Sequence, residues 1–387
     1  MSAAGHTLVV TNDYPPRAGG IQSFVQGLVS RQPADSVTVY APAWKGAAAY
    51  DAEQPYEVVR HRTSLMLPEP FVIRRARELM RDKGATRVLF GAAAPLGLIS
   101  DSLRGVGAEH IVGLTHGHEA AWASLPGSRQ ALRIIGERTD TITFLGEYTR
   151  VRIAGALGER AAGRMRQLVP GVDDEVFHPR NLAAGRVVRE GYGLADRPVV
   201  VCVSRLMPRK GQDTLIEALP LLQRRIPDAA LLVVGGGPHR EQLQRMTVEL
   251  GLERDVVLTG TVPWAELPAH YAAGDVFAMP CRTRNRGLDV EGLGIVYLEA
   301  SATGLPVVAG DSGGAPDAVL EGETGYVVPG GDPKAVAGRL AELLADPELR
   351  SRLGANGRTW IEAKWRWPLI SDRLSRLLAG QDPDAEA

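Results

Sequence analysis

The chain has 387 residues, a formal net charge of -1 and 23% charged residues, a composition typical of folded globular domains rather than disordered chains. The near-zero net charge excludes a general electrostatic attraction to nucleic acid. Cys202 and Cys281 are the only cysteines, which argues against a disulfide framework or a zinc site. No run approaches the ~20 apolar residues of a membrane span, and the first residues lack the pattern of a signal peptide. We therefore expect a cytoplasmic protein.

Short apolar runs alternate with amphipathic stretches along the whole chain, which predicts buried parallel strands separated by helices. In the first half, these runs begin at Thr7, Ser36, Arg87, His110 and Thr141. In the second half, they begin at Val199, Ala230, Val256, Val276, Val307 and Tyr326. The pattern predicts an α/β protein with two doubly wound, Rossmann-like domains.

Proline, glycine and acidic residues interrupt this alternation at 169–173, where we place the domain junction. We expect an N-terminal domain over 1–170, a second domain over 171–364, a helix over 365–380 that returns to the first domain, and a polar tail over 381–387. Because ligands of open α/β sheets bind outside the carboxyl ends of the strands, we expect an interdomain cleft to hold the ligand.

The first strand leads into a loop rich in proline and glycine that ends at Gly19 and Gly20, before a helix from Ile21. A phosphate or a sugar can approach these glycines without meeting a Cβ atom, and a helix N-terminus attracts anions. The alternative is an ordinary strand-to-helix loop. The spacing is not that of a dinucleotide fingerprint.

A basic amphipathic helix is predicted after Pro70. It carries Arg74, Arg75, Arg77 and Arg81 beside apolar residues, as do helices that lie on anionic bilayers. The alternative is a helix with one solvated face and one buried face.

His116 and His118 follow an apolar strand and precede a helical stretch. One imidazole is therefore expected to face the site as an acid, a hydrogen-bond donor or a helix cap. His-x-His spacing also suits a metal, but the sequence offers no further cluster to complete a coordination shell. We expect no metal.

In the second half, Arg205 and Lys210 follow a fully apolar strand and precede a helix opened by Gly211. The planar guanidinium and the compact ammonium together suit a pyrophosphate, and they would stabilise charge developing on a nucleoside diphosphate leaving group. The alternative is a solvated basic turn. Glycine turns at 235–237 and 260–262 are interpreted as structural, although the second also has backbone groups to offer a base.

Glu291 and Glu299 stand on either side of a predicted helix start. The intervening residues 292–294 bring the backbone close to a ligand, and the first free amides of the helix suit a diphosphate. Glu299, about two turns along, is placed to accept hydrogen bonds from ribose hydroxyls, with Glu291 nearer the reacting sugar. The alternative is a capped helix with two solvated acids.

These segments together resemble the retaining glycosyltransferases of the GT-B fold, family GT4, over almost the whole chain. The resemblance is carried by TNDYPPRAGGIQSF, YAPAWKGAAAYD, FGAAAPLGL, THGHEAAW, SRLMPRKG and DVFAMPCRTRNRGLDVEGLGIVYLEAS. These motifs are similar to those of the bacterial GDP-mannose-dependent transferases that add the second mannose to phosphatidylinositol mannosides. One departure is Gly146, where relatives often carry serine.

The resemblance implies GDP-α-mannose as the donor, O-6 of inositol in phosphatidylinositol monomannoside as the acceptor position, and retention of the α configuration. No cofactor is implied beyond the donor substrate. The implied catalytic residues are His118, Arg205, Lys210 and Glu291. The implied donor-binding residues are Gly19, Gly20, Arg205, Lys210, Val262, Glu291, Gly292, Leu293, Gly294, Ile295 and Glu299. Acceptor candidates are Asn12, Asp13 and Arg17.

Three alternatives stay open. The chain could be a GT4 transferase with another nucleotide sugar or a soluble acceptor, an epimerase of the GT-B group, or a noncatalytic sugar-binding module. The SRLMPRKG segment and the glutamate pair favour a transferase. We expect GDP-mannose, phosphatidylinositol monomannoside and an anionic membrane surface as partners, with a peripheral position on the inner face of the plasma membrane and no nucleic acid.

Overall fold

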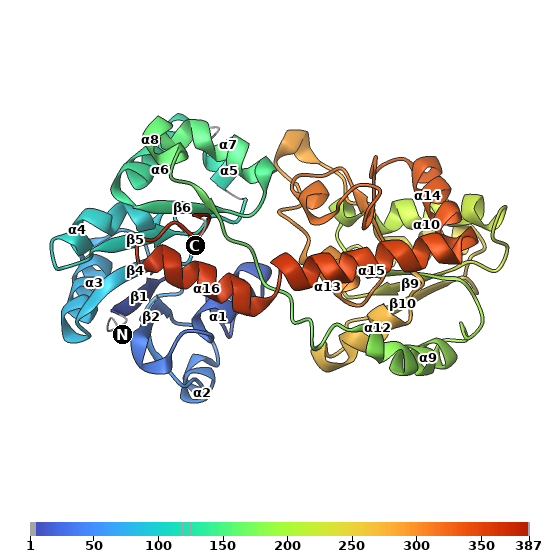
Figure 1. Cartoon of the computed structure of the whole chain (residues 1–387), viewed down its shortest axis with the longest axis horizontal. Helices are drawn as coiled ribbons and strands as arrows, with labels where there is room; N and C mark the ends of the chain where they lie inside the picture. The colour runs from blue at the N-terminus through green and yellow to red at the C-terminus, as the bar shows by residue number, and fades with distance from the viewer. Residues whose placement is uncertain (1–4, 118, 124, 386–387) are drawn as a thin grey trace. The chain divides into compact units, whose positions relative to one another are not determined.

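The computed structural model describes residues 5–117, 119–123 and 125–385. The chain divides into two compact units, which we call unit 1 (Met1–Gly171 with Trp367–Ala387) and unit 2 (Val172–Arg366). Each unit is an α/β domain in which helices flank a parallel sheet (Figure 1).

The observed boundaries differ slightly from the expected ones. Trp365 and Arg366 lie in unit 2 rather than in the returning helix, because the backbone N–H of Val172 donates to the Trp365 carbonyl at 2.7 Å and Val172 also bridges Arg366. The returning helix begins at Trp367, whose side chain packs on Gly171 in unit 1.

Unit 1 contains a seven-stranded parallel sheet in the order β3-β2-β1-β4-β5-β6-β7. Its strands are β1 (His6–Val10), β2 (Val37–Pro42), β3 (Glu57–His61), β4 (Ala85–Phe90), β5 (His110–Gly113), β6 (Thr141–Phe144) and β7 (Arg166–Gln167). The sequence prediction missed β3 and β7. Both are edge strands, and β3 buries only His61 fully while β7 has two residues, so neither forms an apolar run.

The helices of unit 1 are α1 (Gly20–Val29), α2 (Ala47–Ala52), α3 (Pro70–Asp82), α4 (Ser100–Arg104), α5 (Glu119–Trp122), α6 (Pro126–Arg138), α7 (Glu147–Leu157), α8 (Glu159–Ala162) and α16 (Trp367–Leu378). Helix α3 buries Val72, Ala76, Leu79 and Met80, a helical spacing that packs one face onto the core. Helix α16 packs against α1.

Unit 2 contains a six-stranded parallel sheet in the order β10-β9-β8-β11-β12-β13. Its strands are β8 (Val199–Val203), β9 (Ala230–Val234), β10 (Val256–Gly260), β11 (Val276–Met279), β12 (Val307–Gly310) and β13 (Gly325–Val328). These strands confirm the six apolar runs predicted in the second half. All residues of β8 and β9 are buried, as expected for strands covered on both faces.

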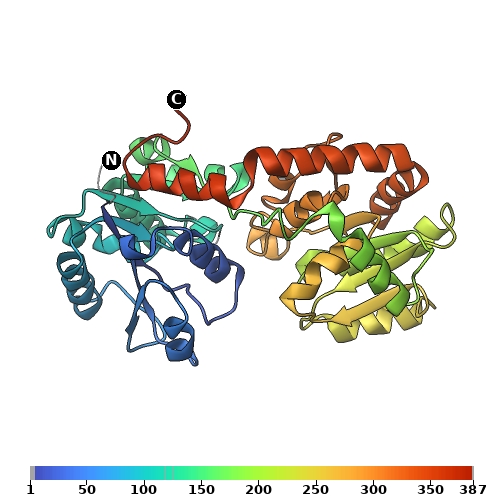
Figure 2. The same cartoon turned by 60° about the horizontal axis from the view of Figure 1, so that its bottom comes forward.

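The helices of unit 2 are α9 (Leu182–Gly191), α10 (Gln212–Gln223), α11 (Arg240–Glu249), α12 (Leu267–Ala272), α13 (Ile295–Ala302), α14 (Pro333–Ala345) and α15 (Pro347–Lys364). The long helix α15 runs along the outside of unit 2 and packs on α13 and α14 (Figure 2).

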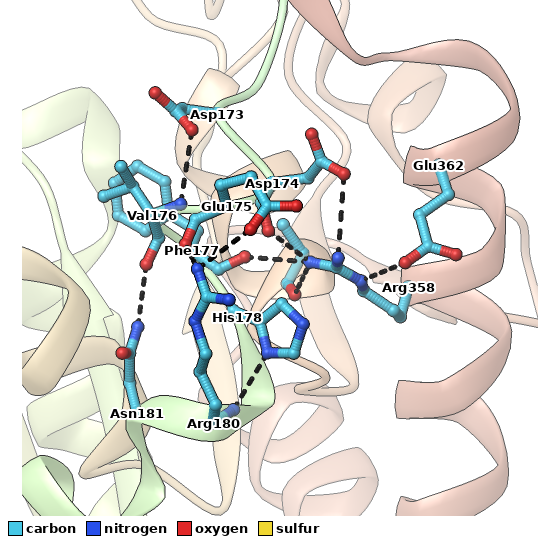
Figure 3. Close-up of polar contacts among 11 residues, drawn as sticks. Asp173, Asp174, Glu175, Val176, Phe177, His178, Arg180, Asn181, Arg358 and Glu362 are labelled. Carbon is cyan, nitrogen blue, oxygen red and sulfur yellow. Dashed lines mark hydrogen bonds and ion pairs between the residues drawn. The ribbon is translucent and has the colours of Figure 1, made fainter.

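The first residues of unit 2 are held by one arginine on α15. Nη1 of Arg358 donates to the carbonyl oxygens of Asp174, Phe177 and Ala302 at 2.8, 3.0 and 3.0 Å. Its Nε donates to Glu362 at 2.6 Å. Figure 3 shows this guanidinium reaching from α15 into the turn of the entering segment. The entry of the chain into unit 2 is therefore fixed to the helix by which the chain leaves it.

Strand order reverses once in each sheet, between β1 and β4 in unit 1 and between β8 and β11 in unit 2. Loops that follow the strands on either side of such a reversal diverge and leave a crevice at the carboxyl edge of the sheet. Gly19 and Gly20 follow β1, Arg205 and Lys210 follow β8, and Glu291 follows β11.

Candidate active site

The loop between β8 and α10 places basic side chains at the strand reversal of unit 2. Arg205 is exposed, whereas Arg209 and Lys210 are half-buried. Gln212 fixes the loop, because its Nε2 donates to Ser204 Oγ at 2.8 Å and to the Arg205 carbonyl at 3.2 Å. The cations are therefore presented by an ordered turn.

Glycines allow this loop to lie close to its neighbours. Gly211 has a φ of 77°, and a Cβ there would stand 2.0 Å from the carbonyl oxygen of Pro280. Gly235 has a φ of 139°, and a Cβ there would stand 2.1 Å from the carbonyl oxygen of Ser204. Larger residues do not fit these positions.

Lys210 and Glu291 form a largely buried ion pair. The Nζ atom lies 2.6 Å from Glu291 Oε2, and the side chains are 12% and 8% exposed. Arg209 extends the cluster, with Nη1 3.4 Å from Asp289 Oδ1 and Nε 3.7 Å from Glu291 Oε2. The sequence prediction gave no role to Arg209 or Asp289. Arg209 directly precedes the predicted Lys210, and one residue separates Asp289 from the predicted Glu291.

The backbone around Glu291 is held by the loop that follows β12. The Glu291 N–H donates to Ser312 Oγ at 3.2 Å, and the Gly314 N–H donates to the Glu291 carbonyl at 2.9 Å. Helix α13 then begins at Ile295, with Gly294 as its N-cap at a φ of 83°. The segment thus presents the first amides of α13 beside the carboxylate, an arrangement that favours an anionic ligand. Ser312 and Gly314 were not among the predicted residues.

The remaining predicted residues of this segment are Gly292, which is half-buried, and Leu293, which is 3% exposed. A Cβ on Gly314 would stand 2.2 Å from the Gly292 carbonyl oxygen. The two loops are therefore in backbone contact.

Glu299 lies in α13, where Tyr271 of α12 donates a hydrogen bond to its Oε2 at 2.6 Å. Burial raises the pKa of Glu299 to about 7, and the Tyr271 hydrogen bond opposes part of that rise. Burial also raises the pKa of Tyr271 well above its ordinary value, so this phenol stays a donor. The sequence prediction did not include Tyr271, because this residue lies on α12, outside the motif that contains Glu299.

Val262 is half-buried and follows β10, whose last residue, Gly260, has a φ of 78°. β10 is two strands from β8 in the sheet. At ~4.8 Å per strand, this separation is roughly 10 Å, which suits a base held at one end and a pyrophosphate at the other.

In unit 1, Gly19 and Gly20 are exposed at the start of α1. Apart from its two chain neighbours and its own helix backbone, no described atom lies within 4 Å of where a Cβ on Gly20 would stand. A Cβ on Gly19 would meet the end of the Gln22 side chain at 2.1 Å. The amides at this helix start are thus open to a ligand on the side of Gly20.

The acceptor candidates of the first loop separate in the structure. The Asn12 side chain pairs with the backbone of Met66, donating from Nδ2 at 2.9 Å and accepting at Oδ1 from the Met66 N–H at 2.7 Å. Asp13 Oδ1 accepts from Gln22 Nε2 at 2.7 Å, and Arg17 is exposed. These Asn12 atoms therefore hold the loop after β3, and the interpretation of Asn12 as an acceptor contact stays a prediction.

His118 lies outside the described residues. The imidazole of His116 bonds to the backbone after β4, with Nε2 2.6 Å from the Gly91 carbonyl oxygen. The buried Glu119 accepts from the N–H groups of His116 and Gly117 at 2.9 and 3.1 Å. This carboxylate, which the sequence prediction did not include, holds the backbone at His116 and Gly117.

Helix α3 exposes only part of its predicted basic face. The side chain of Arg74 is 70% exposed and Arg81 is exposed, whereas Arg75 is 43% exposed and pairs with Glu78 at 3.2 Å. Arg77 is half-buried. Among the described residues, no group of three or more His, Cys, Asp and Glu side chains is arranged to hold a metal ion.

Comparison with known proteins identifies relatives of this chain. Residues 188–360 match the family model of glycosyl transferases group 1. The chain is 55% identical over 378 residues to the GDP-mannose-dependent alpha-(1-6)-phosphatidylinositol monomannoside mannosyltransferase of Mycolicibacterium smegmatis, covering 97% of this chain and 98% of the relative. The chain belongs to the group 1 glycosyl transferases. A second relative of this glycosyl transferase, from Corynebacterium glutamicum, is 44% identical over 98% of this chain and 100% of its own, and its name specifies a monoacylated monomannoside.

Solved structures support the expected GT-B fold of this glycosyl transferase. The crystal structure of Anabaena Alr3699/HepE in complex with UDP superposes with a TM-score of 0.80 at 19% identity, covering 97% of this chain and 100% of the other. WaaG, a glycosyltransferase involved in lipopolysaccharide biosynthesis, superposes with a TM-score of 0.67 at 19% identity over 97% and 100% of the two chains. At these identities, the likeness concerns the fold.

Proposed function

We propose that this glycosyl transferase moves mannose from GDP-α-mannose to O-6 of inositol in phosphatidylinositol monomannoside, giving the dimannoside. The observation that carries the proposal is the 55% identity over 98% of the M. smegmatis mannosyltransferase. The charged cluster of Arg209, Lys210, Asp289 and Glu291 supports it, because the cluster adjoins a helix start suited to a diphosphate.

In the proposed reaction, O-6 of the acceptor forms a bond to C1 of mannose while the bond from C1 to the β-phosphate oxygen breaks. The acceptor proton passes to the departing phosphate, and GDP leaves. Arg205, Lys210 and the first amides of α13 would stabilise the charge that develops on the diphosphate. Glu291 would accept hydrogen bonds from mannose hydroxyls, and Glu299 from the ribose.

Attack on the same face as the departing group gives retention without a covalent intermediate. A double displacement needs a carboxylate positioned as a nucleophile on the opposite face of the sugar. Glu291 is instead paired with Lys210 at 2.6 Å. A carboxylate in such a pair is better suited to accept hydrogen bonds from sugar hydroxyls than to attack C1 as a nucleophile. We therefore favour front-side transfer.

We also propose that the enzyme works as a peripheral protein on the inner face of the plasma membrane. The side chain of Asn12 holds the backbone of Met66, a buried residue in the loop after β3. The two residues that flank Met66, Leu65 and Leu67, are 54% and 48% exposed. This clamp directs two leucines outward. In the described part of the chain, no helix has both the length and the apolar character needed to cross a bilayer.

A third exposed apolar side chain, that of Phe71, follows these leucines in the first turn of α3 and is 53% exposed. The guanidinium carbons of Arg62 and Arg74 lie 5.3 and 5.4 Å from the centre of the Phe71 ring. Apolar side chains flanked by cations suit a bilayer that contains anionic lipids. We call Leu65, Leu67 and Phe71 the membrane patch.

The test is mass spectrometry of lipid products after incubation of the purified protein with phosphatidylinositol monomannoside and either GDP-mannose or UDP-glucose. We expect a gain of one hexose with GDP-mannose only. A hexose gain with UDP-glucose would overturn the assignment of GDP-mannose as the donor. If neither donor gives a lipid product, the assignment of phosphatidylinositol monomannoside as the acceptor is overturned.

A further inference from the structure

A cation and an indole lie together on the surface of unit 1. The guanidinium carbon of Arg17 is 5.3 Å from the centre of the Trp44 ring, Arg17 is exposed and Trp44 is 43% exposed. Arg17 belongs to the loop after β1 and Trp44 to the loop after β2, and these strands are neighbours in the sheet. The pair therefore stands at the carboxyl edge of the sheet, where ligands of such folds bind.

One largely buried cation, Arg60, bonds to both loops. Arg60 of β3 donates to the Pro15 carbonyl at 2.6 Å and to the Pro42 carbonyl at 3.1 Å. It also pairs with Asp51 of α2 at 2.7 Å, and the two side chains are 13% and 18% exposed. One guanidinium thus ties the loop of Arg17, the loop of Trp44 and α2 to the sheet.

Tyrosines fill the space around this cation. Tyr14 is 2% exposed, donates to the Tyr56 hydroxyl at 2.7 Å and meets the Tyr50 ring edge-to-face with ring centres 6.2 Å apart. The Arg60 guanidinium lies 5.6 Å from the centre of the Tyr14 ring. The loops that carry Arg17 and Trp44 are therefore anchored to packed, hydrogen-bonded side chains, as in a preorganised binding surface.

The order of the strands places this pair between the proposed membrane patch and the glycine loop that is expected to bind the donor. The membrane patch follows β3, Trp44 follows β2, and Arg17 with Gly19 and Gly20 follows β1. At ~4.8 Å per strand, the edge from β3 to β1 spans roughly 10 Å. A headgroup whose acyl chains stay in the bilayer would have to pass over Trp44 to reach the glycine loop.

Resting on the proposed function, we propose that Arg17 and Trp44 form the subsite for the headgroup of the lipid acceptor. The guanidinium pairs with the phosphodiester of the acceptor, a charge-assisted contact that arginine makes with two oxygens. The indole packs against the apolar C–H face of a carbohydrate ring and so sets the orientation of the headgroup. Trp44 then acts as a specificity-determining residue, because an acceptor without a sugar ring on the phosphodiester gains nothing from it.

The experiment measures kcat and KM for two acceptors, phosphatidylinositol monomannoside in vesicles and its water-soluble deacylated headgroup. The variants are Arg17→Ala, Trp44→Ala and the conservative Trp44→Phe. Arg31→Ala is the matched control, because Arg31 also lies over an indole of unit 1, that of Trp367 at 4.2 Å, but beyond the C-terminal end of α1.

We expect Arg17→Ala and Trp44→Ala to raise KM for both acceptors by about tenfold, equivalent to ~1.4 kcal/mol, with KM for GDP-mannose within a factor of about two. Trp44→Phe should recover most of the loss, and Arg31→Ala should match the wild type. Melting temperature and GDP binding report whether each variant is folded. If Trp44→Ala does not fold, Trp44→Phe must still show an intermediate acceptor KM.

Unchanged acceptor KM in the folded variants overturns the subsite. An increase seen only with vesicles also overturns it, since that result assigns the pair to membrane adsorption. If the wild type itself transfers mannose to neither acceptor, the proposed function fails and the subsite fails with it.

Discussion

The Nζ atom of Lys210 lies 2.6 Å from Oε2 of Glu291, and the two side chains are 12% and 8% exposed. The pair joins the cation proposed to hold the pyrophosphate to the carboxylate proposed to hold the mannose. A ligand that approaches one of these groups therefore acts on a charge already balanced by the other. Removal of either partner leaves an uncompensated charge in a poorly solvated place.

Lys210→Ala is expected to lower turnover strongly while the protein stays folded. Loss of one preorganised charge contact to the leaving group costs about 10²–10³-fold in kcat. Loss of one partner of a buried ion pair costs about 3–5 kcal/mol in unfolding free energy, less than a folded domain of this size holds in reserve. Steady-state kinetics and denaturant unfolding measure the two effects.

Arg197→Ala is the matched control for Lys210→Ala. Arg197 pairs with Asp255 in unit 2, with side chains 23% and 24% exposed, but both residues precede their strands and so lie at the opposite edge of the sheet. This variant should lose stability and keep its turnover. An unchanged turnover in Lys210→Ala would remove the lysine from the mechanism.

The pKa of Glu299, raised to about 7 by burial, predicts a pH dependence of donor capture. Only the carboxylate can accept hydrogen bonds from both ribose hydroxyls through its two oxygens. We expect kcat/KM for GDP-mannose to rise with pH through about 7, and the Glu299→Gln variant to show a lower value without this step.

Unfolding does not account for such a loss at low pH. Because folding raises the pKa of Glu299 from 4.5 to about 7, the stability contributed by this group is complete below pH 4.5 and is lost as pH rises through about 7. Stability and donor capture therefore change in opposite directions. A pH profile that is the same in Glu299→Gln and the wild type would contradict the assignment.

Gly294 is expected to tolerate no side chain. It has a φ of 83°, and a Cβ there would stand 2.4 Å from Cε2 of Tyr297. Gly294→Ala should cost more than ~1 kcal/mol in unfolding free energy and weaken GDP binding, because α13 can no longer begin where it does. Gly338 in α14 is the control, since no atom of the described residues lies within 4 Å of where its Cβ would be. Gly338→Ala should stabilise the protein by about 0.5–1 kcal/mol, and equal effects of the two substitutions would contradict the argument. Calorimetry of unfolding and of GDP binding gives both values.

The central strands could be predicted from the sequence because helices cover both faces of the sheet, so that every side chain of such a strand is buried and apolar. In β8, every residue of VVVCV is buried, so the run stands out from its surroundings. The edge strand β3, EVVRH, buries only His61 and looks like a loop in the sequence. Edge strands of this kind are recognised only when a neighbour such as β2 is known to need a partner.

The site could be predicted in part, because Lys210 and Glu291 belong to local motifs with a chemical meaning. Their direct pairing could not, since it depends on how the loops after β8 and β11 meet. The same holds for the bond from Tyr271 to Glu299 and for the hold of Asn12 on Met66, which join separate elements. Sequence patterns report which residues have suitable chemistry, whereas long-range packing decides which of them are already engaged.

The membrane patch predicts a binding defect that is independent of catalysis on soluble acceptor. Phe71→Ser and Leu67→Ser each remove an exposed apolar side chain, and their combination should weaken binding to vesicles with anionic lipid by about tenfold or more. Val187→Ser is the control, because Val187 is 66% exposed on α9 of unit 2. Vesicle sedimentation measures the affinity. Equal binding by the double variant and the control would reject the patch.

Arg358 predicts a stability effect far larger than its position on a surface helix suggests. The Arg358→Ala variant leaves three carbonyl oxygens, those of Asp174, Phe177 and Ala302, without this donor. Hydrogen bonds from a charged group to buried acceptors are worth about 1.5–3 kcal/mol each and are not additive, so we expect a loss of roughly 2–4 kcal/mol. Arg352 is exposed on the same helix, and Arg352→Ala should change stability by less than ~0.5 kcal/mol.

Limited proteolysis separates a local from a global effect of Arg358→Ala. If the arginine mainly fixes the entry of the chain into unit 2, cleavage within 172–181 should appear under conditions where the wild type and Arg352→Ala stay intact. Cleavage spread over the whole of unit 2 would instead assign Arg358 to the general stability of the domain. Because the entering segment also pairs with Trp365 through Val172, its release should free both chain crossings together.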